Sequence, residues 1–228
     1  WPKCDQAAWV AAIAPGTVLD DAIGRGALWR QPTRRRGSKC YGRWLSYLIV
    51  AGKLVPEDVP TSRIDRATVR DYVTLLSEQV QPWTVWSYTL SLYLVARAFA
   101  PDGDWDWLYK IVAKLKVKRL PSRDKLSRMR APGEIAAWAY RQMNSLDVSE
   151  SRNKRNALQY RNPLFIAILV NCPMRLRNLT MIRIGKHLQQ TGDCYRLDFV
   201  PNEVKTDRYL TLHLPKVLTP FLGAWITE

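Results

Sequence analysis

The sequence predicts a mainly α-helical protein with one small antiparallel β-hairpin near its C-terminal end. Apolar residues recur at helical spacing in successive segments, both before residue 116 and again after residue 133. Alternation of apolar and polar residues, which is typical of a strand, occurs at 195–199 and at 209–214. The residues between these two runs contain proline, asparagine and aspartate, and they predict the turn of a hairpin.

A strongly basic segment divides the chain. Residues 116–133 hold seven cations, one acid and two prolines, and a segment of this composition is expected to be extended because it cannot bury itself. The sequence therefore predicts a helical domain over 1–115, clearest over 33–115, then a basic linker over 116–133 and a second domain over 134–228.

In the first domain the predicted helices cover 5–14, 33–50, a segment that starts near Asp65, a segment that starts near Thr84, and 105–115. Asp65 has the character of an N-cap residue. The apolar stripes that should face the core are Tyr41, Trp44, Leu45 and Leu48, then Val69, Tyr72, Val73 and Leu76, and then Val85, Tyr88, Leu92, Val95 and Phe99. Trp9, Trp44 and Trp138 have apolar neighbours and are also expected in the core.

In the second domain a helix is predicted from Pro132, followed by a buried helix over 157–170 and the hairpin. A final amphipathic segment, 217–225, predicts one more helix.

Composition restricts the partners of the chain. The 228 residues are 47% hydrophobic with a net charge of +15, so we expect a folded protein that attracts polyanions, most often nucleic acid. No apolar run reaches the roughly 18 residues that a membrane span needs, and no signal peptide opens the chain. We therefore expect no membrane partner. The first residue is Trp1 rather than methionine, so we expect a fragment or a trimmed form of a longer protein.

The cysteines predict no metal site. They are widely scattered, at positions 4, 40, 172 and 194, and only His187 and His213 could assist them as ligands. This scatter is typical of reduced thiols in a cytoplasmic protein.

Two groups of cations are candidate DNA contacts. The first group opens the helix over 33–50 and comprises Arg34, Arg35, Arg36, Lys39 and Arg43. Cations at a helix N-terminus oppose the macrodipole, so an external anion such as a backbone phosphate would relieve them. The second group lies in the linker and comprises Lys118, Arg119, Arg123, Lys125, Arg128 and Arg130. The alternative for both groups is a solvated surface.

The residues that follow the second buried helix are the most informative. Arg175, Arg177 and Arg183 occur within nine residues, interleaved with apolar side chains. The planar guanidinium group suits a phosphate held at two oxygens. Further along the chain, Lys205 lies in the predicted turn of the hairpin.

The run from Pro173 to Leu179, followed by Lys205 in a hairpin, resembles the arginine motif and the hairpin lysine of the tyrosine recombinases, the phage-integrase family. The resemblance has two departures: Pro173 replaces the usual glycine and Asn178 replaces the usual acid. It implies a SAM-like helical core-binding domain followed by a truncated α+β catalytic domain with a small antiparallel β-hairpin. The two domains would close around double-stranded DNA.

The resemblance also implies roles for individual residues. Arg175 would hold the scissile phosphate and stabilise its developing charge, and Lys205 would protonate the leaving oxygen as a general acid. Arg177 and Arg183 would lie on other faces of the helix, and two roles stay open for them: contact with the DNA backbone, for which Arg177 is the candidate, or a structural role. The reaction needs neither a metal nor another cofactor, and the family works as a homotetramer on DNA.

The remaining catalytic residues of the family are not found before Glu228. His213 is not followed by the expected arginine, and Tyr195 and Tyr209 are strand residues rather than the nucleophile. The sequence therefore predicts the DNA-binding fragment of a site-specific recombinase or integrase of a mobile genetic element, inactive alone although its parent is an enzyme. Two alternatives stay open: a non-catalytic DNA-binding or regulatory protein on the same scaffold, and a helical RNA-binding protein.

Overall fold

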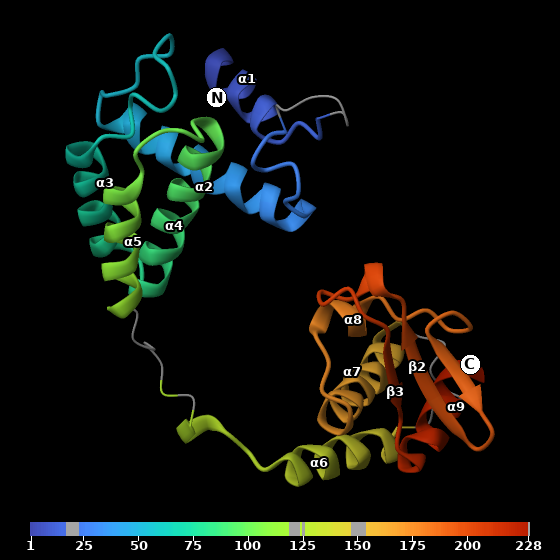
Figure 1. Cartoon of the computed structure of the whole chain (residues 1–228). Coiled ribbons are helices and arrows are strands. Elements are labelled where there is room, and N and C mark those ends of the chain that lie inside the picture. The colour runs from blue at the N-terminus through green and yellow to red at the C-terminus, as the bar shows by residue number, and fades with distance from the viewer. Residues whose placement is uncertain (17–22, 119–123, 125, 147–153, 228) are drawn as a thin grey trace. The chain divides into compact units, whose positions relative to one another are not determined.

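The chain forms two compact units, 1–124 and 125–228. The computed structural model describes residues 1–16, 23–118, 124, 126–146 and 154–227 (Figure 1). The boundary between the units falls inside the segment 116–133, whose ends are helical: α5 extends to Val117 and α6 begins at Pro132. The described residues are mainly helical, with one three-stranded antiparallel sheet.

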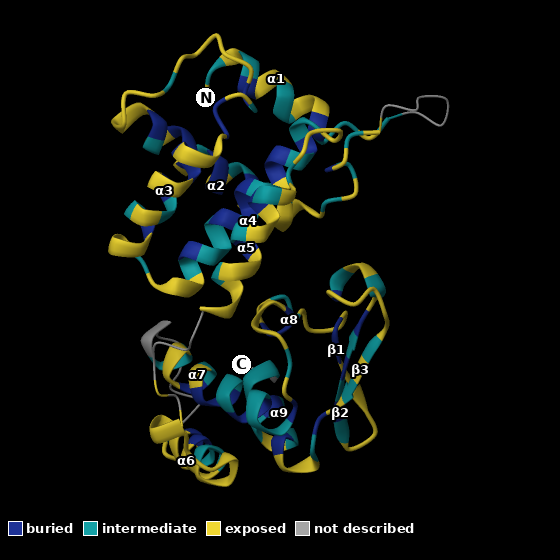
Figure 2. Cartoon of the chain, turned by 60° about the vertical axis from the view of Figure 1, so that its left-hand side comes forward, coloured by how far each residue is buried: buried dark blue, intermediate teal, exposed yellow. Residues whose placement is uncertain are grey.

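Unit 1 is a bundle of helices. Its elements are α1 (Lys3–Ala12), α2 (Gln31–Val50), α3 (Arg66–Gln79), α4 (Pro82–Phe99) and α5 (Asp106–Val117). The predicted stripes supply its core, because Tyr41, Trp44, Val69 and Val95 have no more than a trace of exposed surface. In Figure 2 buried and exposed residues alternate along α3, as expected for an amphipathic helix.

Helix α4 organises unit 1, since it packs against α1, α2, α3 and α5. A helix with neighbours on several sides must be apolar on several sides. Accordingly its buried positions include the small residues Ser91, Ala96 and Ala98 outside the predicted stripe, which allow neighbouring helices to approach closely.

The starts of the helices follow local rules. The Asp65 carboxylate accepts hydrogen bonds from the backbone N–H groups of Ala67 and Thr68 at 2.8 and 3.0 Å, which confirms its predicted role as the N-cap of α3. Helices α2, α4 and α6 each have a proline in their first turn, where the missing N–H would have no intrahelical partner.

A buried charge cluster joins α1 to the loop that precedes α3. The Arg63 guanidinium donates to both oxygens of the Asp5 carboxylate at 3.0 and 2.9 Å, and the Tyr41 hydroxyl donates to the same carboxylate at 2.5 Å. Burial raises the pKa of Tyr41 far above its ordinary value, and its hydrogen bond to Asp5 adds to the effect, so the phenol stays protonated. The cluster fixes α1 against the rest of unit 1.

Unit 2 combines helices with the sheet. Its elements are η1 (Leu126–Arg128), α6 (Pro132–Asn144), α7 (Lys154–Asn171), α8 (Leu176–Thr180), β1 (Leu188–Thr191), β2 (Cys194–Phe199), η3 (Pro201–Glu203), β3 (Leu210–His213), η4 (Lys216–Leu218) and α9 (Thr219–Thr227). Helix α7 packs against α6 and α9. The predicted buried helix is confirmed, with Leu164, Ala167 and Ile168 in the core.

The sheet has the order β1-β2-β3, and both neighbouring pairs are antiparallel. The pairing of β2 with β3 confirms the predicted hairpin, and Tyr195, Leu197 and Phe199 of β2 enter the same core as α7. The sequence analysis missed β1. Only its first residue, Leu188, is buried, so this edge strand lacks the alternation that would reveal it.

One core prediction is wrong. Trp138 on α6 is 42% exposed, whereas its neighbour Ala139 and the next-turn residue Met143 are buried. Only one side of α6 meets the core, and Ala139 rather than Trp138 lies on that side. Trp44 is fully buried and Trp9 is partly buried against the core of unit 1.

Candidate nucleic-acid interface

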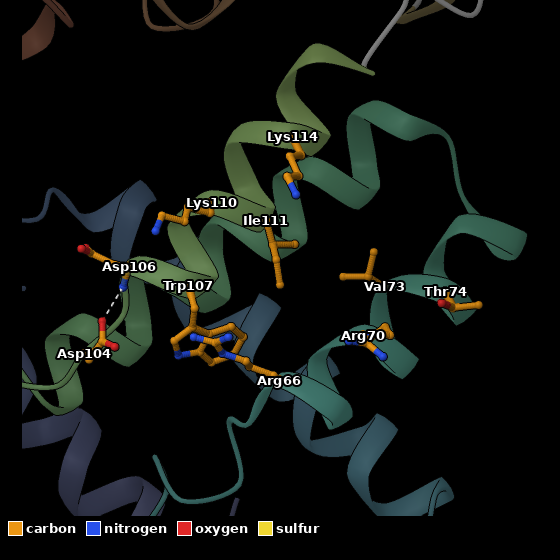
Figure 3. Close-up of a pocket in the computed structure, with 10 residues that line it drawn as sticks. All are labelled: Arg66, Arg70, Val73, Thr74, Asp104, Asp106, Trp107, Lys110, Ile111 and Lys114. Carbon is orange, nitrogen blue, oxygen red and sulfur yellow. Dashed lines mark hydrogen bonds between the residues drawn. The ribbon is translucent and has the colours of Figure 1, made fainter.

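A basic groove lies between α3 and α5 of unit 1 (Figure 3). Its volume is about 670 Å³, and its lining residues are Arg66, Arg70, Val73, Thr74, Asp104, Asp106, Trp107, Lys110, Ile111 and Lys114. Four cations against two carboxylates give the groove a net positive charge, although the acids lie at one end only, in and just before the first turn of α5.

Helical spacing produces this arrangement. Arg66 and Arg70 are four residues apart on α3, and Lys110 and Lys114 are four residues apart on α5, so each pair occupies one face of its helix. In Figure 3 Val73 and Ile111 extend into the space between the helices. Two rows of cations thus border an apolar floor, which suits a ligand with regularly spaced anionic groups.

The aromatic side chain in the groove has a cationic neighbour. The Arg66 guanidinium lies over the Trp107 ring, 5.8 Å from its centroid, in a cation–π contact. This contact holds Arg66 at the edge of the groove. Lys118, a predicted DNA contact, follows Lys114 by four residues as the exposed C-cap of α5, and so continues the same row of cations.

The predicted contacts on α2 have different surroundings. Arg34 donates to the backbone carbonyls of Trp29 at 2.9 Å and Ala27 at 2.7 Å, so part of its hydrogen-bonding capacity serves the preceding loop. Arg36 donates to the Ser87 hydroxyl on α4. Arg43 lies over the Tyr88 ring at 5.3 Å. Arg35 and Lys39 are exposed.

The linker cations are described only in part. Arg119, Arg123 and Lys125 lie outside the described residues, whereas Arg128 and Arg130 are exposed in unit 2. Their predicted contact with DNA stays a prediction.

In unit 2 the structure brings Arg175 next to the turn between β2 and β3. A hollow of about 460 Å³ is lined by Arg175, Val204, Thr206, Arg208, Tyr209 and Leu210. Lys205 is exposed in the same turn, between two of these lining residues. Arg175 therefore meets residues at least 29 positions further along the chain in one basic hollow. Arg208 gives this hollow a second arginine, which the sequence did not single out.

The position of Arg175 follows from the short helix that it opens. Arg175 is the N-cap of α8, with extended backbone, and its carbonyl accepts the N–H groups of Asn178 at 2.8 Å and Leu179 at 3.2 Å. Leu179 is buried in the core. This anchor leaves Arg175 at the surface with its side chain toward the hollow, and it leaves Arg177 exposed on α8.

Asn178 occupies the position where the resembled family has an acid. It is 2% exposed, and among the described residues its side-chain nitrogen finds no hydrogen-bond partner. A buried polar group without a partner lowers stability, so this side chain costs unit 2 some of its stability.

A second polar cluster lies at the start of the turn between β2 and β3. The Glu203 carboxylate accepts hydrogen bonds from the Lys186 ammonium and from Nε2 of His187, the latter at 3.2 Å to each oxygen. The hydrogen bond from Lys186, and after it the one from His187, lower the pKa of Glu203 to about 2. The side chain of His187 is 2% exposed.

This cluster predicts an acid-sensitive contribution to stability. Because folding lowers the pKa of Glu203 from 4.5 to about 2, the ionised carboxylate stabilises unit 2 fully above pH ~4.5, and this stabilisation is lost as the pH falls through about 2. We expect Glu203→Gln to lower the melting temperature near neutral pH, and the difference from wild type to shrink steadily toward about pH 2. Melting curves at a series of pH values measure this difference, and a difference independent of pH would contradict the assignment.

The sequence matches no family model, and comparison with curated proteins and with solved structures finds no match. Within the described residues, every helix is too short or too polar to span a lipid bilayer. The described residues also contain no group of three or more His, Cys, Asp or Glu side chains that could hold a metal ion.

Proposed function

We propose that this chain is the DNA-binding, phosphate-holding part of a site-specific tyrosine recombinase of the integrase type. The observation that carries the proposal is the hollow in which Arg175 meets the β2–β3 turn containing Lys205. Arg175 and Lys205 lie 30 residues apart in the sequence, and their proximity depends on how α8 and the sheet pack.

The chemistry of the hollow suits a phosphodiester. Arg175 and Arg208 provide two permanently charged guanidinium groups, and Thr206 adds a hydroxyl donor. Positive charge held in advance around a phosphate stabilises the extra charge that develops during phosphoryl transfer. In this proposal Arg175 holds the scissile phosphate and Lys205 protonates the leaving oxygen. The covalent step is assigned to no tyrosine of this chain.

Unit 1 would supply affinity for the duplex. The rows Arg66–Arg70 and Lys110–Lys114 can neutralise successive backbone phosphates on the two sides of the α3–α5 groove. Such contacts position a protein on DNA without reading its sequence. The basic face of α2, with Arg35 and Lys39 exposed, is a second candidate contact surface.

Removing two cations of the groove should weaken binding strongly. By counterion release each phosphate contact changes the salt slope of log K by about 0.9, so Arg70→Ala combined with Lys110→Ala should reduce the slope by about 1.8 and the affinity for duplex DNA at 0.1 M salt by roughly 60-fold. Fluorescence anisotropy of a labelled duplex at several salt concentrations measures both quantities.

A matched control separates the groove from net charge. Lys3 and Arg25 are exposed cations of unit 1 outside the groove lining, and Lys3→Ala combined with Arg25→Ala removes the same charge. We expect this control to change affinity less than about three-fold, because only direct phosphate contacts release condensed counterions. Equal losses in the two double variants would show that the groove does not bind DNA.

Competition with RNA tests the alternative partner. Under the proposal, unlabelled duplex DNA displaces the labelled duplex at lower concentration than single-stranded RNA of the same length. The reverse order would favour a helical RNA-binding protein, and the recombinase proposal would then fail. Tight duplex binding by a complete gene product that lacks strand exchange would instead support a non-catalytic DNA-binding protein on the same scaffold.

A further inference from the structure

We propose that Glu203 and His187 form a brace that positions the β2–β3 turn, with Lys205 and Arg208, against Arg175. This inference rests on the proposed function, because it assigns the brace a role in phosphate binding at the hollow. Neither residue lines the hollow itself, so both would act as positioning residues.

Glu203 determines the start of the turn. Its Oε2 atom accepts the N–H of Val200 at 3.2 Å, which closes the short helix η3, while both carboxylate oxygens contact Nε2 of His187. The next residue, Val204, is buried in the core and also lines the hollow. The conformation at Glu203 therefore sets where the following residues, Lys205 to Arg208, leave the core.

His187 ties this turn to the segment that follows Arg175. The backbone N–H of Arg183 donates to Nδ1 of His187 at 3.0 Å, and the N–H of His187 donates to the Arg183 carbonyl at 2.8 Å. Because Nδ1 accepts a hydrogen bond, the ring proton belongs on Nε2, where it can be donated to Glu203. The ring also stacks on Phe199 of β2, with centroids 5.2 Å apart.

A continuous series of contacts thus joins the two halves of the hollow. It runs from Arg175 through the anchored helix α8 to Arg183, across the His187 ring to Glu203, and from there into the turn. His187 and Glu203 are buried or nearly so, with side chains 2% and 13% exposed, so water competes little for these hydrogen bonds.

The sign of the expected effect distinguishes positioning from simple electrostatics. Glu203 is an acid near a site proposed to bind an anion, so removing its charge should strengthen DNA binding if charge alone mattered. If Glu203 acts as a brace, its removal should weaken DNA binding instead. We expect Glu203→Ala to weaken duplex binding about eight-fold at 0.1 M salt and to lower the salt slope by about 0.9, because one phosphate contact is lost.

Asp193→Asn is the matched control. This carboxylate also belongs to unit 2 and is 86% exposed in the link between β1 and β2, and among the described residues it makes a long contact of 3.4 Å with Lys216. We expect its removal to leave duplex binding unchanged or slightly stronger. His187→Phe is the second test variant: it keeps an aromatic ring for stacking on Phe199, removes the hydrogen bond from Nε2 to Glu203, and should reproduce the loss seen with Glu203→Ala.

A double-mutant cycle with Arg175→Ala locates the effect. Duplex affinity and salt slope are measured for wild type, each single variant and the double variant, after melting curves establish which variants are folded. If the brace acts through the hollow, Glu203→Ala causes little further loss of duplex affinity in a protein that already carries Arg175→Ala. Where Glu203→Ala does not fold, Glu203→Gln and His187→Phe provide the same cycle.

The outcomes separate the two proposals. The brace is overturned if the Glu203 variants bind the duplex more tightly than wild type, as is expected for Asp193→Asn. It is also overturned if the affinity losses of the Glu203 and Arg175→Ala variants add fully in the double variant. If Arg175→Ala changes neither affinity nor salt slope, the hollow binds no phosphate and the proposed function of Arg175 fails. A loss with Arg175→Ala and none with the Glu203 or His187 variants overturns the brace alone.

Discussion

Under the proposed function, replacing Arg175 with alanine is expected to reduce strand exchange by about 10³-fold at saturating DNA, which is the usual scale for removing a charge that stabilises a phosphoryl-transfer transition state. Affinity for the duplex should fall by less than about ten-fold, because only one phosphate contact disappears. The measurement is the single-turnover rate of strand exchange by the full-length protein, compared with its affinity for the duplex from fluorescence anisotropy. The separation between rate and affinity is what identifies a catalytic arginine.

The control for this prediction is another arginine of the same unit. Arg141 is exposed in the last turn of α6 and does not line the hollow, so Arg141→Ala should retain the rate within about two-fold, as is usual for a surface substitution. If Arg175→Ala reduced rate and affinity by the same factor, the arginine would be an ordinary backbone contact, and its catalytic assignment would be wrong.

Replacing Asp5 with alanine is expected to destabilise unit 1 by about 3–5 kcal/mol, since it removes one partner of a buried ion pair and leaves the other charge uncompensated. Arg63 would keep a guanidinium whose side chain is only 2% exposed. The Tyr41 hydroxyl would lose its acceptor at the same time. Urea unfolding followed by tryptophan fluorescence reports on this unit, because eight of the ten tryptophans precede residue 125.

A surface ion pair provides the comparison. Asp71 contacts Lys53 at 2.9 Å, but its side chain is 57% exposed, so Asp71→Ala should change the free energy of unfolding by at most about 1 kcal/mol. A loss of less than about 1 kcal/mol with Asp5→Ala would show that the cluster contributes no more than a surface pair. It would also show that α1 docks mainly through its apolar contacts.

The local elements of the fold could be predicted because their causes are local. Stripes such as Val69, Tyr72 and Leu76 are helical by spacing alone, and all three are buried in the core of unit 1. Asp65 marks the start of α3 through bonds to residues two and three positions away. The β2–β3 hairpin was visible because its strands alternate, whereas β1 was not, since an edge strand with one buried residue carries too little pattern.

The candidate site was predictable only in pieces. Arg175 and Lys205 were named from a motif and a turn, and their common hollow depends on how α8 and the sheet pack. The α3–α5 groove was missed because Arg70, Lys110 and Lys114 are unremarkable singly as surface cations. Their spacing is a usable signal, but it does not say which helix faces which.

The sequence by itself determined the helical periodicity of this protein, its caps, its hairpin and its positive charge, since each depends on residues a few positions apart or on composition. The tertiary structure alone decided which charges meet. It placed Asp5 against Arg63, 58 residues away, and the segment after Arg175 against Glu203 through His187. Spacing along a helix or strand fixes the face on which a side chain lies, but only packing around α4 and α7 determines what that face contacts.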